Sequence, residues 1–212
     1  MPRMKKKAIG SATIDVALVV IRTGTTDSGL EIAVDTANKI GVEPQTETVD
    51  AIKLVKNRRL LAQKPQETTI TGHRITLTDN VFIVELVKIF QGGTIEGSGD
   101  TLTYTPPVAG SGEKGEIFEL EAYSAEYDAS GQIVRYEKIT YPNCQGTPIS
   151  ITSEDGVFRI PEYTIDSAPN TGQAPYKLSY VKELPDFSNE VNAMSLGDEM
   201  SPSVEETGLA RK

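Results

Sequence analysis

The stretch "HRITLTDNVFIVELVKIFQGGT", residues 73–94, holds the one clear helix signal in a chain whose other patterns indicate strands. Apolar side chains recur at helical spacing in its second half and form a stripe wide enough to require burial. The predicted members of the buried face are Phe82, Leu86 and Ile89. The pattern predicts an amphipathic helix over about residues 79–91, packed against a sheet.

Both ends of this helix carry typical terminating residues. Thr78 or Asp79 can cap the N-terminus, because a side-chain oxygen there accepts free backbone N–H groups. Asp79 would also lie near the positive end of the helix dipole. Gly92 and Gly93 can end the helix, since glycine adopts the left-handed C-terminal conformation without strain.

Segments on either side of the helix alternate apolar and polar residues or are rich in β-branched ones, as strands are. The alternation in residues 67–78 slips phase at Gly72, which indicates a bulge or bend. A hairpin is predicted where "KNRR", residues 56–59, turns the chain. The expected strands cover residues 13–22, 30–34, 47–56, 60–64, 67–78, 101–105, 116–128, 133–142, 147–153, 157–163 and 175–184. These patterns predict a mainly β fold, an antiparallel β-barrel or sandwich with one flanking helix.

The 212 residues fit one domain with length left for arms. We expect the domain over residues 13–185, with an aperiodic long loop at 35–46 that contains Gly41 and Pro44. We expect residues 1–12 to form a flexible basic arm rather than a signal peptide, because Asp15 breaks the apolar stretch that follows. Residues 186–212 are polar and acidic, and we expect them to form a disordered tail. No apolar run is long enough to span a membrane.

The net charge of −9 argues against a nucleic-acid-binding module, which needs excess Lys and Arg to replace counterions. It is compatible with a wall that nucleic acid passes without binding. Four basic residues stand against this trend near the predicted hairpin tip: Lys53, Lys56, Arg58 and Arg59. They indicate either a solvated tip or a contact with acidic surfaces of neighbouring copies. The one cysteine, Cys144, cannot form an internal disulfide, which suits a reducing cytoplasm.

The sequence contains no recognisable catalytic or metal-binding constellation. His73, the one histidine, shares a strand face with apolar residues and lies in no motif, so a structural role is expected. "GSGEKG", residues 110–115, matches G-x-G-x-x-G, but prolines precede it and a strand follows, which predicts a flexible turn. Glu119 and Glu121 lie about 7 Å apart along one strand face, an arrangement common on solvated sheets as well as in glycosidases. We expect neither an enzyme nor a cofactor or metal site.

Two long stretches resemble a known family. "DAIKLVKNRRLLAQKPQETTITGHRITLTDNVFIVELVKIFQGG", residues 50–93, is similar to the core of the tail tube proteins of tailed bacteriophages. Residues 118–185, which contain "YDASG", "YPNC" and "YKLSYVKELP", resemble the second half of that domain. The similarity covers roughly residues 45–185 and is one of pattern, without a catalytic signature.

The resemblance implies a structural virion protein that assembles into hexameric rings, which stack into the tail tube through which DNA is ejected. Its implied partners are further copies of itself, the tape measure protein and other tail proteins. DNA would pass through the channel without specific binding, and no membrane is involved. The implied location is the virion tail, after synthesis in the bacterial cytoplasm. The resemblance extends to contractile tails, non-contractile tails and phage-like bacteriocins and does not choose among them.

Within that architecture, acidic residues are expected on the channel wall and flexible segments between rings. The candidates for the channel are Glu119, Glu121 and Glu137, although the same face could simply meet outer solvent. The candidate inter-ring contacts are Lys53, Lys56, Arg58 and Arg59, together with the arm and the 35–46 loop.

Two alternatives stay open at this point. Another tail component, such as a tail terminator or baseplate hub, would form one ring without polymerising. A carbohydrate- or surface-binding β-sandwich would be expected to display aromatic side chains, yet the chain has no Trp and only 6% aromatic residues.

Overall fold

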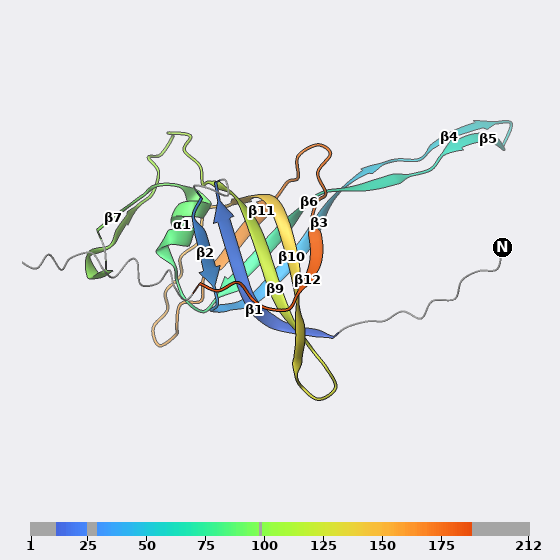
Figure 1. Cartoon of the computed structure of the whole chain (residues 1–212). Coiled ribbons are helices and arrows are strands. Elements are labelled where there is room, and N and C mark those ends of the chain that lie inside the picture. The colour runs from blue at the N-terminus through green and yellow to red at the C-terminus, as the bar shows by residue number, and fades with distance from the viewer. Residues whose placement is uncertain (1–11, 25–28, 98, 188–212) are drawn as a thin grey trace, which may run out of the picture.

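The computed structural model describes residues 12–24, 29–97 and 99–187, and these form a mainly antiparallel β structure with one short α-helix (Figure 1). The helix is α1 (Val84–Gln91), and a 3-10 turn, η1, covers Gly99–Thr101. The strands are β1 (Thr13–Thr23), β2 (Glu31–Val34), β3 (Ala37–Val49), β4 (Ile52–Lys56), β5 (Arg59–Lys64), β6 (Glu67–Asp79), β7 (Thr94–Glu96), β8 (Thr103–Thr105), β9 (Ile117–Tyr127), β10 (Ile133–Gly146), β11 (Glu162–Ser167) and β12 (Lys177–Val181). The predicted arm at 1–12 and tail at 186–212 lie almost wholly outside the described residues.

Eight strands form one antiparallel sheet in the order β2-β1-β9-β10-β11-β6-β3, with β12 also paired to β10. In Figure 1, β1, β9 and β10 lie in front of β6 and β3, so the sheet folds over into two layers. β10 joins the layers, because residues 136–140 pair with β12 and residues 144–146 with β11. A register shift in β10 and the left-handed Asn143, with φ of 47°, mark the bend between these two parts. The predicted sandwich is confirmed. Among the described strands, β2 and β3 each have only one neighbour, so the sheet does not close into a barrel.

The predicted irregularity at Gly72 is confirmed, since the β3–β6 register shifts where Gln45 meets Gly72. A Cβ on Gly72 would lie 2.3 Å from the carbonyl oxygen of Ser167, so this close approach of two strands requires glycine. The predicted loop over residues 35–46 is wrong, because most of it lies in β3 and pairs with β6. β3 is an edge strand. Proline has no N–H to donate to a neighbouring strand, and an edge strand tolerates Pro44 because one of its sides has no neighbour to bond.

The helix begins later than the sequence pattern predicts. Asp79 ends β6 and is fully buried, where it accepts a hydrogen bond from the Thr36 hydroxyl at 2.6 Å. Pairing with β3 therefore extends β6 through the predicted cap. The N-cap residue is Ile83, which provides no side-chain hydrogen bond. The predicted C-terminal glycine is confirmed, since Gly92 has φ of 82° and its N–H donates to Lys88 O at 2.8 Å.

The main core lies between the two layers and beneath α1. Leu86 and Ile89 are buried as predicted, and Phe90 extends the helix face, with its ring 5.2 Å from that of Tyr163. Phe82 lies before the helix and is only half-buried. The buried members of this cluster are Val19, Ile21, Val34, Ile75, Leu77, Leu86, Ile89, Phe90, Phe118, Leu120, Ala122, Tyr141, Cys144, Tyr163 and Ile165.

A smaller cluster lies on the opposite side of β1 and β9, formed by Leu18, Val20 and Tyr123. Val181 at the end of β12, and Leu184 and Phe187 after it, pack on this cluster. Apolar side chains are thus covered on both faces of this layer.

The predicted hairpin over residues 147–163 is wrong. Residues 147–161 form an irregular segment, and the strand β11 begins only at Glu162. Pro148 and Pro161 lack the N–H groups that a regular ladder needs. No helix in the described ranges has both the length and the hydrophobicity that crossing a bilayer would need.

Candidate functional site

The most exposed element of the fold is the hairpin formed by β4 and β5, which projects far from the sheet (Figure 1). All residues of both strands are exposed to solvent. Asn57 and Arg58 form the turn with φ of 52° and 62°. Two successive positive φ values are typical of the tight turns that match the twist of paired strands. The hairpin predicted around "KNRR" is therefore confirmed.

Large apolar side chains cover both faces of this hairpin. Ile52 and Leu54 lie on one face, opposite Lys64 and Ala62, whereas Val55 lies on the other, opposite Leu60. Each of these apolar side chains is more than half exposed: Ile52, Leu54, Val55, Leu60 and Leu61. An isolated two-stranded ribbon is marginally stable in water, and exposed apolar patches mark interaction surfaces. The hairpin therefore has the properties of a surface that is completed by a partner.

The four basic residues named from the sequence lie on this hairpin. Lys53 and Lys56 are in β4, Arg58 is in the turn and Arg59 begins β5, and all four are exposed. Within the described part of the chain, none of the four forms an ion pair. Their positive charge is therefore available to another molecule. Their role between rings stays a prediction.

A cluster of charges lies across β1, β9 and β10, on the face covered by the chain after β12. Glu121 is only 3% exposed, and its carboxylate accepts a hydrogen bond from the Tyr123 hydroxyl at 2.7 Å. Arg22 Nη1 lies 2.5 Å from Glu121 Oε2, and Lys138 forms an ion pair with Oε1. One carboxylate thus interacts with two cations and one hydroxyl.

These contacts determine the direction of each pKa shift. Burial raises the pKa of Glu121, but the hydrogen bonds from Lys138, Arg22 and Tyr123 outweigh burial and lower it overall. Burial lowers the pKa of Lys138, but the hydrogen bond and charge of Glu121 raise it overall. Burial also lowers the pKa of Arg22, but its hydrogen bonds to Glu121 and Glu31 and the charges of these two carboxylates raise it overall. All three groups are therefore held in their charged forms at neutral pH.

Glu121 was expected on an exposed channel face, and that expectation is wrong, because the side chain is buried and its charge is compensated. Glu119 and Glu137 are half-buried. Glu119 lies 3.9 Å from Arg22, and Glu137 accepts a hydrogen bond from the Tyr180 hydroxyl at 3.4 Å. Glu137 pairs with Ser124 and therefore lies on the opposite face of the β9–β10 layer from Glu119. Each stays a candidate for a channel wall, but the two cannot belong to the same wall.

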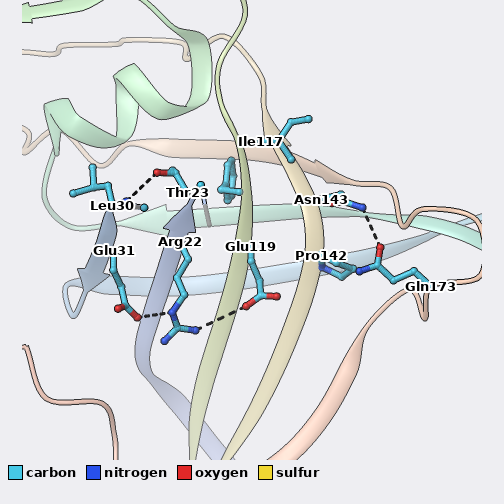
Figure 2. A pocket seen from close by; sticks show the side chains of 12 residues that line it. Arg22, Thr23, Leu30, Glu31, Ile117, Glu119, Pro142, Asn143 and Gln173 are labelled. Atoms are coloured by element: carbon cyan, nitrogen blue, oxygen red, sulfur yellow. Dashed lines mark hydrogen bonds and ion pairs between the residues drawn. The ribbon is translucent and has the colours of Figure 1, made fainter. Parts of the chain in front are cut away.

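An open cleft of about 400 Å³ lies near the ends of β1 and β9. Figure 2 shows Arg22 between Glu31 and Glu119 on one side, and the Asn143–Gln173 hydrogen bond on the other. The Arg22 and Glu31 side chains are 2.5 Å apart. Because Arg22 compensates the carboxylates in the cleft, their arrangement is that of a polar surface recess rather than an acid–base pair.

His73 and Cys144 have structural surroundings. His73 is 5% exposed, with its ring centroid 5.4 Å from those of Tyr141 and Tyr176, and burial lowers its pKa. Cys144 is fully buried, and burial raises its pKa to about 12, so its reactive thiolate is suppressed. No group of three or more His, Cys, Asp or Glu side chains within the described residues could hold a metal ion.

Two features of the molecular surface were not predicted from the sequence: the charged partners of Glu121 and the exposed apolar segment 147–161. Arg22 and Lys138 were not recognised as partners of Glu121, although charges within strand patterns are a signal for such pairing. Residues 147–153 and 157–163 were assigned to the strands of a hairpin, yet residues 147–161 form an irregular segment that exposes several apolar side chains, with Phe158 93% exposed.

No protein-family model matches the sequence, and no curated protein matches it. Several solved structures are similar at low identity. The baseplate of the anti-feeding prophage aligns with 84% of this chain and 98% of its own, at 9% identity and a TM-score of 0.35. The tube-terminating cap of the same particle covers 82% and 95%, at 10% identity and a TM-score of 0.41. The sheath–tube complex of PVC, an extracellular contractile injection system, covers 79% and 92%, at 12% identity and a TM-score of 0.35.

Proposed function

We propose that this chain is a structural subunit of a phage tail or phage-like tail particle. In this proposal it self-assembles into hexameric rings that stack into the tail tube, the conduit for DNA. The resemblance of residues 45–185 to tail tube proteins supports this reading. The observation that carries it is the β4–β5 hairpin, which is exposed throughout and apolar on both faces.

The fold offers separate surfaces for the two contacts that a tube requires. β2 and β3 are unpaired sheet edges in the described structure, and such edges are templates for pairing with another chain. We assign the contacts within a ring to these edges. The projecting hairpin reaches away from the sheet and is assigned to contacts between rings. A ring needs a head-to-tail interface that closes, whereas stacking needs one that does not.

In this arrangement one of Glu119 and Glu137 faces the channel, because the two lie on opposite faces of the β9–β10 layer. The overall charge of −9 keeps DNA from adhering to the wall. Glu121 contributes to the sheet rather than to the wall, because Arg22 and Lys138 compensate it. The protein acts as a conduit and not as an enzyme.

The proposal is tested by negative-stain electron microscopy of the purified chain over a range of concentrations, with light scattering on the same samples. We expect rings and long hollow tubes, with scattering that rises steeply with concentration. Single rings that never stack would indicate a terminator or hub instead. A monomer at every concentration would contradict self-assembly.

A further inference from the structure

The irregular segment 147–161 presents an apolar surface that the proposed function does not yet use. Phe158 is 93% exposed, and Ile151, Val157 and Ile160 are each more than half exposed. Beside them lies a cleft of about 290 Å³, whose lining includes Phe82, Ile151 and Ile160. Such a concentration of apolar side chains on one surface segment indicates a contact site.

Several contacts hold this segment in a defined shape. At its start, Thr147 N donates to Thr164 O at 3.0 Å, and Ile149 N donates to Gln91 Oε1 at 3.1 Å. Near its end, the Arg159 guanidinium lies 5.4 Å from the Phe82 ring centroid and donates to Ser153 Oγ at 2.6 Å. These contacts fix the backbone of residues 147–161, so the apolar side chains have defined positions on the surface.

The charges of this surface are opposite to those of the hairpin. Glu154, Asp155 and Glu162 are exposed, and none of them forms an ion pair within the described residues. The one basic side chain of the segment, Arg159, is engaged with Phe82 and Ser153. The hairpin combines exposed apolar residues with unpaired Lys and Arg, so the two surfaces are complementary in both respects.

The fold places the two surfaces at opposite ends of one strand. At one end of β6, Glu67 pairs with Val49 at the base of the hairpin. At the other end, Asp79 N donates to Pro161 O at 3.1 Å. The 13 residues of β6 span about 40 Å. A hairpin that points away from that strand cannot reach the 147–161 segment of its own chain.

We propose that segment 147–161, with its adjacent cleft, is the docking surface for the β4–β5 hairpin of another copy of this chain. This inference rests on the proposed function and names the receiving side of the contact between rings. Because donor and acceptor lie at opposite ends of the molecule, the contact is head to tail, the type that can repeat along a filament without closing. Stacking therefore requires no other protein.

The first test is cross-linking between copies. Cys144 is fully buried, so introduced thiols are selectively labelled. Chains carrying Lys56→Cys and chains carrying Asp155→Cys are mixed, assembled and treated with a short bismaleimide. We expect a mixed dimer as the main adduct, and none between Lys56→Cys and Ser130→Cys, an exposed position in another turn. Tubes that yield no mixed dimer would overturn the inference.

The second test is charge exchange. Lys56→Glu with Arg59→Glu, or Glu154→Lys with Asp155→Lys, should shorten tubes more than about tenfold, because like charges across an interface are strongly unfavourable. The four substitutions together in one chain should restore length. If all variants form wild-type tubes, the docking surface is wrong while the tube function stands. A wild-type chain that forms no rings would instead contradict the function itself.

Discussion

The carboxylate of Glu121 shows how a single charge is accommodated inside a small β fold. A buried charge costs several kcal/mol unless it is paired and hydrogen-bonded. Here β1 and β10 flank β9 and supply Arg22 and Lys138, while Tyr123 on the same strand supplies a hydroxyl. The network ties three adjacent strands together.

Replacing Glu121 with Gln should destabilise the fold by about 1–3 kcal/mol at neutral pH, because Lys138 loses its ion-pair partner and Arg22 loses its most buried carboxylate. The native pKa of Glu121 is lowered from 4.5, so its contribution is present above that pH and is lost as pH falls through the lower native pKa. Glu121→Gln should therefore lose less stability on acidification than wild type. Urea unfolding at pH 7 and at pH 3.5 measures both effects.

The half-buried Glu119 provides the control, since its one ion pair within the described residues is the 3.9 Å contact with Arg22. Glu119→Gln should change the free energy of unfolding by less than about 1 kcal/mol. Equal acid sensitivity of wild type and Glu121→Gln would contradict the assigned network.

At the scale of elements, α1 depends on its surroundings, because an isolated eight-residue helix is not stable in water. Two glycines let neighbouring segments lie directly on its end. A Cβ on Gly146 would lie 2.3 Å from Phe90 Cβ, and one on Gly115 would lie 2.3 Å from Phe90 O. Gln91 adds a polar link, because its amide nitrogen donates to the Tyr104 hydroxyl at 2.8 Å.

Gly146→Ala should lower the free energy of unfolding by about 1–3 kcal/mol, because the added methyl group overpacks the contact with Phe90. Thermal unfolding followed by circular dichroism measures the change. Gly41→Ala is the matched control, since the nearest atom to its Cβ would be 3.9 Å away. If both variants unfold at the wild-type temperature, the helix does not rest on Gly146 as described.

At the scale of the whole molecule, stability and assembly reside in different regions. The core lies between the two sheet layers and beneath α1, whereas β4 and β5 contribute no buried side chain. We therefore expect the hairpin to contribute little to folding and to be available for association.

Replacing residues 52–64 with Asn-Gly should leave the unfolding temperature close to that of wild type, because no core contact is lost, while tubes no longer form. Electron microscopy and thermal unfolding of the same preparation separate the two effects. Ile133→Ser with Val134→Ser, which alters exposed apolar residues in another part of the sheet, should still assemble. A truncated chain that forms normal tubes would remove the hairpin from the assembly.

Features that depend on local chemistry were predictable from the sequence. Period-two alternation identified β1, β6 and β9, and helical spacing identified the buried Leu86 and Ile89. The phase slip at Gly72 and the hairpin turn at Asn57 were also predictable, because strand faces and turns depend on only a few neighbouring residues. The exposed basic residues of the hairpin followed from the same local reading.

Other features were decided by partners distant in the chain. β3 is a strand because β6 pairs with it, despite Gly41 and Pro44, and Asp79 ends that pairing instead of capping the helix. Glu121 is buried on the face of β9 whose apolar cluster is covered by the end of β12 and the chain after it, and β1 and β10 supply its charged partners. Local sequence specifies periodicity and turns, whereas edge pairing, compensation of charge and coverage of a sheet face depend on residues brought together only by the tertiary structure.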